Sequence, residues 1–81
     1  MTELASRVRA IVSATFGLPL AQVTDATGSD NLESWDSMNH LHLIVALEAE
    51  FEVSFDPQQA IELTSVRKIE DALRTLGRDR P

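Results

Sequence analysis

The stretch that decides the fold is residues 33–51, "ESWDSMNHLHLIVALEAEF". Asp36 and Ser37 are both favoured at helix starts, and apolar residues follow them at helical spacing without Pro or Gly. We therefore predict a helix over residues 37–51. One broad apolar face of this helix is expected to hold Met38, Leu41, Ile44, Val45 and Phe51. Leu43 is expected to point away from that face.

Ser37, at the start of this predicted helix, has two interpretations. It caps the helix, sharing that task with Asp36, since both residue types accept hydrogen bonds from the first helical N–H groups. Alternatively, its hydroxyl carries a group. A phosphate ester there would lie at the positive end of the helix dipole, which stabilises negative charge.

Three further helices are predicted around this one. Apolar residues at helical spacing predict a helix over residues 3–16, ended by Gly17. Asp56 as a cap and Pro57 at the first position predict a short helix of two turns at most. A last helix is expected after Thr64 as a cap, ending at Gly77, and its residues spaced for burial are Val66, Ile69, Leu73 and Leu76.

The connection over residues 17–35 is long and broken by Pro19 and Gly28, yet it is rich in apolar residues. We expect it to pack against the helices. The fold class is therefore all-α: a small antiparallel bundle of three main helices plus one short helix, forming one domain over residues 1–77 with a frayed tail at 78–81. The expected core includes Val8, Val12, Leu41, Val45, Ile61 and Leu73.

Charge is distributed unevenly along the 81 residues, whose net charge is −6. No basic residue occurs between Arg9 and Arg67, while nine acidic residues do. This pattern argues against nucleic acid as a partner and favours partners with basic patches. The absence of cysteine, of a signal-peptide pattern and of a long apolar run predicts a cytoplasmic protein without a membrane span.

Catalytic and metal-binding interpretations are disfavoured. Asp36, Ser37 and His40 are the residue types of a hydrolase triad, but no Gly-x-Ser-x-Gly turn or second domain accompanies them. His40 and His42 point in different directions on a helix, so we expect solvated histidines rather than metal ligands. We predict no enzyme activity and no metal site.

The sequence contains "DSM" at 36–38 and "LEAEF" at 47–51, with a long loop before them and helices in the order given above. Together these features resemble acyl carrier proteins over nearly the whole chain. This resemblance implies that Ser37 carries a 4'-phosphopantetheine arm, transferred from coenzyme A by a phosphopantetheinyl transferase. It implies a non-catalytic, monomeric carrier that holds acyl groups as thioesters. Asp36 and Met38 would flank the arm.

The resemblance also assigns partner recognition to the serine helix and the loop before it. The partners would be acyl-loading and acyl-processing enzymes with basic docking patches. The implied contact residues are Glu33, Trp35, Asp36, Met38, Glu48, Glu50 and Glu52, with Glu48 ranked below Asp36 because it falls close to the apolar face.

Departures from the family pattern narrow the kind of carrier that we expect. Asn39, His40 and His42 stand where fatty-acid carriers often place acids, and Trp35 is unlike a housekeeping carrier. We therefore expect a stand-alone carrier of a dedicated pathway, such as polyketide or other secondary metabolite biosynthesis, with fatty acid biosynthesis also open. An aminoacyl cargo remains an alternative, because carriers of D-alanine often show Asp-Ser-Met. The other alternative is a non-modified helical adaptor, in which Ser37 is only a cap.

Overall fold

A computed structural model of the chain describes residues 3–78. Within these residues the secondary structure is helical, with no strand beyond one isolated bridge between Gly28 and Ser65. The predicted all-α bundle of three main helices and one short helix is confirmed; a 3-10 turn, η1, was not predicted. The elements are α1 (Glu3–Phe16), η1 (Leu20–Gln22), α2 (Ser37–Phe51), α3 (Pro57–Glu62) and α4 (Val66–Thr75).

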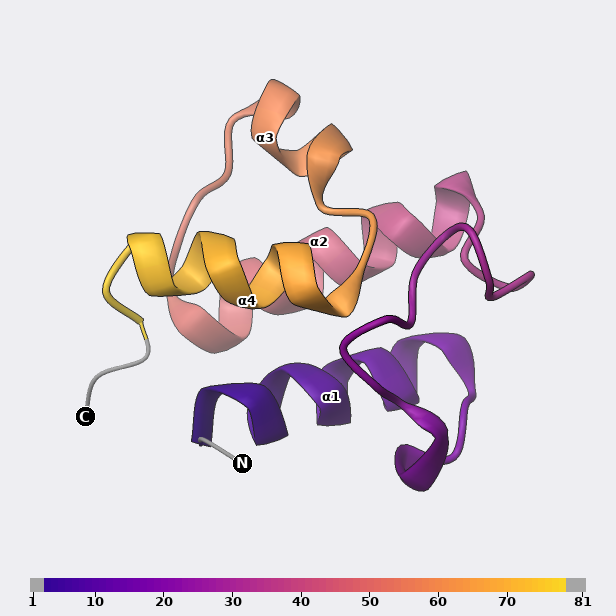
Figure 1. Cartoon of the computed structure of the whole chain (residues 1–81). Coiled ribbons are helices and arrows are strands. Elements are labelled where there is room, and N and C mark those ends of the chain that lie inside the picture. Colours follow the sequence, from indigo (N-terminus) through magenta and orange to yellow (C-terminus); the bar gives the residue numbers. More distant parts are fainter. Residues whose placement is uncertain (1–2, 79–81) are drawn as a thin grey trace.

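The three long helices form the body of the molecule (Figure 1). Helix α1 packs against both α2 and α4 and runs antiparallel to each of them (Figure 1). Helix α3 lies apart from α1, across the far side of α2 and α4 (Figure 1). The side chains that meet at the centre are fully buried: Val8, Val12, Leu43, Leu47, Val66, Ile69 and Leu73.

The buried face of α2 differs from the prediction. Leu43, expected to point away, is fully buried, whereas Leu41 and Val45 are 59% and 58% exposed. The observed buried set, Leu43, Ile44, Leu47 and Phe51, is also a helical stripe. Apolar residues surround most of this helix, so the sequence allowed more than one stripe, and packing against α1 and α4 selected this one.

The predicted helix ends are mostly right. Asp56 caps α3 with Pro57 at its first position, and Gly17 and Gly77 both have the positive φ that favours glycine after a helix. Two expectations at α4 were wrong. The cap is Ser65 rather than Thr64, because Ser65 Oγ accepts the Lys68 N–H at 3.2 Å. Leu76 lies beyond the helix and is 43% exposed.

The long connection packs on the bundle, as predicted. The Trp35 ring stacks on Phe16 with centroids 4.5 Å apart, and Val23 is also buried. The middle of the connection is fastened to the α3–α4 link, because the Ser29 N–H donates to the Thr64 carbonyl at 2.9 Å. Gly28 is needed there, since a Cβ would stand 2.5 Å from that carbonyl oxygen. Leu20 is the exception, at 56% exposed.

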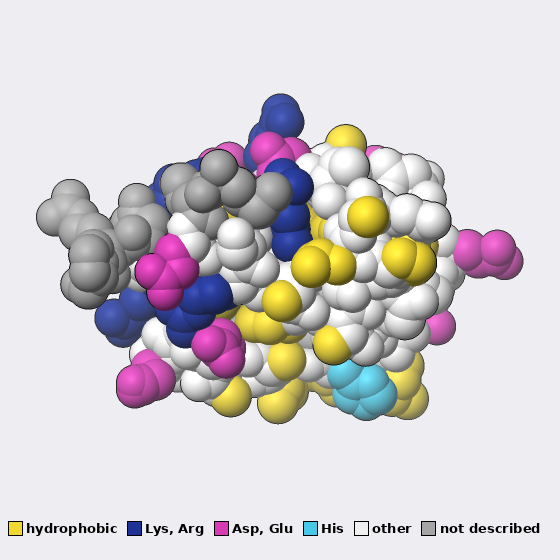
Figure 2. Space-filling model, turned by 90° about the horizontal axis from the view of Figure 1, so that it is seen from below, with side chains coloured by type: hydrophobic (Ala, Val, Ile, Leu, Met, Phe, Trp, Pro, Cys, Tyr) yellow, Lys and Arg dark blue, Asp and Glu magenta, His cyan; other side chains and the backbone are white. Residues whose placement is uncertain are grey.

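The surface seen from the α1 side has two unlike regions (Figure 2). Charged side chains gather toward the left, whereas hydrophobic and uncharged side chains and a histidine occupy most of the middle and right (Figure 2). Among the described residues, no helix is long and apolar enough to cross a membrane. Of the predicted tail at 78–81, only Arg78 is described, and its guanidinium donates to the Glu52 carbonyl at 3.2 Å; residues 79–81 lie outside the described residues.

Candidate functional site

Ser37 is the first residue of α2, and its side chain is exposed. The N-cap is Asp36, whose backbone is extended and whose Oδ1 accepts the Asn39 N–H at 2.9 Å. The interpretation that makes Ser37 the helix cap is therefore wrong, because the neighbouring carboxylate performs that task. The Ser37 hydroxyl stands one position inside the helix.

The backbone leading into Ser37 is held by two hydrogen bonds to one carbonyl. The Asn39 side-chain amide and the Asp36 N–H both donate to the Ser34 carbonyl, each at 2.9 Å. These bonds join the last turn of the connection to the first turn of α2. They fix the direction from which the chain enters the helix and hence the position of Ser37.

His40 links three segments around this site. The Trp35 indole N–H is only a donor, so it donates to His40 Nδ1 at 3.0 Å. The proton of the neutral ring then lies on Nε2, which donates to the Ala60 carbonyl of α3 at 2.8 Å. The expectation of a solvated histidine was wrong for His40, which is half-buried, and right for His42, which is exposed.

A surface pocket of about 380 Å³ lies beside Ser37. Trp35 and Ile61 give it apolar walls, although they come from the connection and from α3. The remaining lining residues are Ser29, Asp36, Ser37, His40 and Thr64. The Trp35–His40–Ala60 hydrogen bonds hold these segments together, so the pocket is part of the folded architecture rather than a property of one helix.

The acids predicted for partner contact have different surroundings. Glu33 and Asp36 are exposed beside the site. Glu48 instead accepts the Phe55 N–H at 2.9 Å, and Glu50 pairs with Arg7 at 2.7 Å. Glu52 ends α2 in a left-handed conformation, with φ of 54°.

Trp35 and Met38, also predicted for partner contact, differ in how far their side chains are exposed. Trp35 is only 6% exposed and serves as packing, whereas Met38 is 64% exposed next to Ser37. Sequence reasoning assigned three residues near the site, Leu41, Val45 and Ile61, to the core, and they are exposed instead. No local signal marks Ile61, because only the folding of α3 over α2 brings it to the pocket.

A group of charged residues away from Ser37 joins α1, the connection and α4. Arg9 donates to Asp25 at 2.7 Å, and this hydrogen bond holds the pKa of the Asp25 carboxyl below its usual range. Burial raises the pKa of Glu70, and the negative Asp25 nearby adds to the effect. Arg74 lies 3.5 Å from Glu70 and partly offsets both causes.

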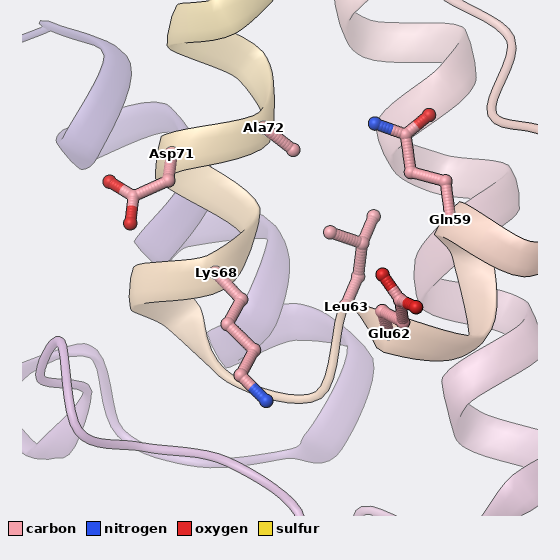
Figure 3. Close-up of a pocket in the computed structure, with 6 residues that line it drawn as sticks. All are labelled: Gln59, Glu62, Leu63, Lys68, Asp71 and Ala72. Carbon is pink, nitrogen blue, oxygen red and sulfur yellow. The ribbon is translucent and has the colours of Figure 1, made fainter.

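A second pocket, of about 340 Å³, lies between α3 and α4 (Figure 3). Gln59 and Glu62 reach it from α3, while Lys68 and Asp71 come from α4 (Figure 3). It contains none of the predicted site residues. Among residues 3–78, no group of three or more His, Cys, Asp or Glu side chains is arranged to hold a metal ion.

The comparison with known families identifies the class of protein. A family model described as "Phosphopantetheine attachment site" matches residues 6–73, which include all of α2 and α3 and most of α1 and α4. The chain therefore belongs to the phosphopantetheine-binding carrier family, consistent with an acyl carrier protein. Members of this family are carriers rather than enzymes, and their cofactor is covalently attached 4'-phosphopantetheine.

Proposed function

We propose that this chain carries 4'-phosphopantetheine on Ser37 and presents acyl groups to partner enzymes. One observation supports this choice of residue above all. The Ser37 hydroxyl is exposed at the start of α2 and is not needed as the cap, because Asp36 caps the helix. A modifying enzyme can use this hydroxyl without opening the helix.

The surroundings of Ser37 suit a phosphodiester. The first N–H groups of a helix lack intrahelical partners, and the dipole there favours negative charge by about 0.3–1 kcal/mol. Asp36 places a carboxylate nearby, but its Oδ1 already accepts the Asn39 N–H. A phosphate on Ser37 would therefore rely on the helix dipole and on first-turn N–H groups other than that of Asn39.

The pocket beside Ser37 suits the group that follows the phosphate. When attached, the cofactor supplies a flexible arm whose terminal thiol holds a thioester. Trp35 and Ile61 offer apolar walls for methyl and methylene groups, and Ser29 and Thr64 offer hydroxyls for amides. Its volume, about 380 Å³, falls within the range of small-molecule sites.

We favour acyl over aminoacyl cargo for the same pocket. Its walls are apolar, and the one carboxylate in its lining, Asp36, already accepts a backbone hydrogen bond. Loading from hexanoyl- or β-alanyl-coenzyme A compares the two cargoes directly. We expect the hexanoyl arm to shift the NMR signal of the single indole, Trp35, more than the β-alanyl arm does. A larger shift with β-alanyl would favour aminoacyl cargo.

The partners are a phosphopantetheinyl transferase and the enzymes that load and process the acyl group. Tethering raises the effective concentration of the acyl group at each partner's active site, since binding of the arm becomes intramolecular. The carrier contributes an accessible attachment point and a surface that partners recognise.

Peptide mass spectrometry tests the attachment residue. After incubation with coenzyme A and a broad-specificity transferase, cleavage after Glu33 and Glu48 releases residues 34–48, which contain Ser34 and Ser37. We expect the added mass on Ser37. Ser34→Ala is the matched control, because Ser34 lies three residues away and is half-buried. Modification of Ser34 or of another peptide would contradict the assignment.

A further inference from the structure

A surface pocket of about 540 Å³ lies between α1 and η1. Ser6 and Arg9 line it from α1, and Leu20 and Ala21 line it from η1. Val23, which directly follows η1, is buried and completes the lining. None of these residues lines the pocket at the attachment site. The volume falls within the range of small-molecule sites, so this pocket is a second candidate binding site.

The η1 side of this pocket is apolar. Leu20 is 56% exposed, although it belongs to a connection that otherwise packs on the bundle. The 3-10 turn fixes its position, because the Leu20 carbonyl accepts the Val23 N–H at 3.1 Å. Figure 2, which views the α1 side, shows hydrophobic side chains directly beside a basic one near the middle of the surface. A ligand that covers such side chains removes apolar surface from water, which favours binding.

The polar end of the pocket is the guanidinium of Arg9. This side chain is only 19% exposed, so the packing of the fold holds it in place. Its Nη2 donates to Asp25 at 2.7 Å, whereas its Nε is buried and has no hydrogen-bond partner in the described part of the chain. An arginine carries five N–H donors, so Asp25 satisfies only part of this guanidinium. The Ser6 hydroxyl, three residues earlier on the same helix, adds a second polar group to the lining.

Positive charge outweighs negative charge at this end of the pocket, although the net charge of the chain is −6. The Asp25 carboxylate lies 2.7 Å from Arg9 and 3.9 Å from Arg67, so two guanidiniums face one carboxylate. The next carboxyl, Glu70, has Arg74 at 3.5 Å, and burial raises its pKa toward the neutral form. The surroundings of Arg9 therefore attract an anion and repel a cation.

We propose that this pocket binds a monocarboxylate with a short aliphatic chain. The carboxylate lies against Arg9, because a guanidinium matches the planar geometry of a carboxylate and binds it by charge-assisted hydrogen bonds. The aliphatic chain covers Leu20, Ala21 and Val23. An amine of the same length would meet the positive charge of Arg9, and a small inorganic anion would leave the apolar wall exposed. This site uses no residue of the attachment site, so it does not depend on Ser37.

Titration of the apo protein with sodium hexanoate, followed by the NMR signals of the Ala21 and Val23 methyl groups, tests the site. We expect saturable shifts with a dissociation constant on the order of 1 mM, typical of a ligand this small. Hexan-1-ol and hexylamine, which lack the carboxylate, should bind at least about tenfold more weakly. Shifts that never saturate, equal binding of hexan-1-ol, or larger shifts at the Trp35 indole than at Val23 would each overturn the proposal.

Two substitutions address the two ends of the pocket. Arg9→Gln removes the cation, and Ala21→Trp fills the apolar side while leaving Arg9 in place. Each should weaken hexanoate binding at least about tenfold. Arg7→Gln is the matched control, because Arg7 also lies on α1 and pairs with an acid at 2.7 Å but does not line the pocket. It should bind within about twofold of wild type, since its loss changes only distant charge.

The outcomes of these variants are decisive in both directions. Equal weakening by Arg7→Gln and Arg9→Gln would show that net charge, not the pocket, attracts the acid. Undiminished binding by Ala21→Trp, which keeps every charge, would overturn the site even if Arg9→Gln does not fold. Ser37→Ala should bind hexanoate as wild type does, so failure of arm attachment and failure of this site are separate results. Circular dichroism melting shows which variants are folded.

Discussion

Asp36 and Ser37 divide two tasks that either residue type is able to perform. The Asp36 carboxylate accepts the Asn39 N–H, and Ser37 then begins the helix with its hydroxyl exposed. The sequence predicted a cap at this pair, since both residues are good caps. It did not predict which one, because that depends on the extended backbone of Asp36.

This division predicts that two alanine substitutions differ in their effect on stability. Asp36→Ala should lower the free energy of unfolding by about 0.5–2 kcal/mol, because the Asn39 N–H loses its acceptor. Ser37→Ala should change it by less than about 0.5 kcal/mol. Urea denaturation measures both, and Asp36→Asn, which keeps a capping oxygen, should behave like wild type. A larger loss for Ser37→Ala than for Asp36→Ala would contradict the assignment of the cap.

Glu70 gives a prediction of pH dependence. Its pKa is raised in the folded state, mainly by burial, so the folded state binds a proton more readily than the unfolded chain. The stability associated with this proton is present at low pH and is lost as pH rises through the raised pKa. Glu70→Gln cannot ionise, so it should melt higher than wild type at pH 7.

The advantage of Glu70→Gln should shrink toward zero near about pH 4, where Glu70 itself is protonated. Asp25 has the opposite sign, because its lowered pKa contributes stability that is lost only in stronger acid. Glu70→Gln also removes the ion pair with Arg74, but this loss should change stability little because Arg74 is 41% exposed. If Glu70→Gln melts above wild type by the same amount at pH 7 and at about pH 4, the charge of Glu70 is not the cause of the difference.

At the scale of elements, the sequence predicted the positions of the helices along the chain better than it predicted which face of each helix is buried. Caps and glycine stops are local, so the bounds of α1 and α2 and the start of α3 followed from residues such as Gly17, Asp56 and Pro57. The orientation of α2 is not local. Leu41 and Leu43 are equally apolar, and only contacts with α1 and α4 distinguish the buried one.

The link between the connection, α2 and α3 depends on His40. His40→Ala leaves the Trp35 indole N–H and the Ala60 carbonyl without this partner, so we expect a loss of about 1–3 kcal/mol. That loss lowers the melting temperature by several degrees in a domain of this size. The fluorescence of the single tryptophan should also change.

His42→Ala is the control for this link, because His42 is exposed on the same helix two residues later. It should leave both the melting temperature and the tryptophan fluorescence close to those of wild type. Equal effects of the two substitutions would mean that the hydrogen bonds of His40 do not hold the three segments together.

At the scale of the whole molecule, net charge alone was a poor guide to the surface near Ser37. The sequence placed nine acids between Arg9 and Arg67, yet residues 37–47 of α2 have none, and Glu48 and Glu50 have partners within the fold. The family and its cofactor were predictable, because the motif, the helix behind it and the order of elements agreed. The pocket beside Ser37 was not, since it needs Ile61 of α3 to lie close to the start of α2.

The most direct test of the carrier function is the intact mass of the protein after incubation with coenzyme A and a broad-specificity phosphopantetheinyl transferase. Wild type and Ser34→Ala should each gain one phosphopantetheine, and Ser37→Ala, folded by circular dichroism, should gain none. No gain by folded wild type with two different transferases, or an equal gain by Ser37→Ala, would contradict attachment at Ser37.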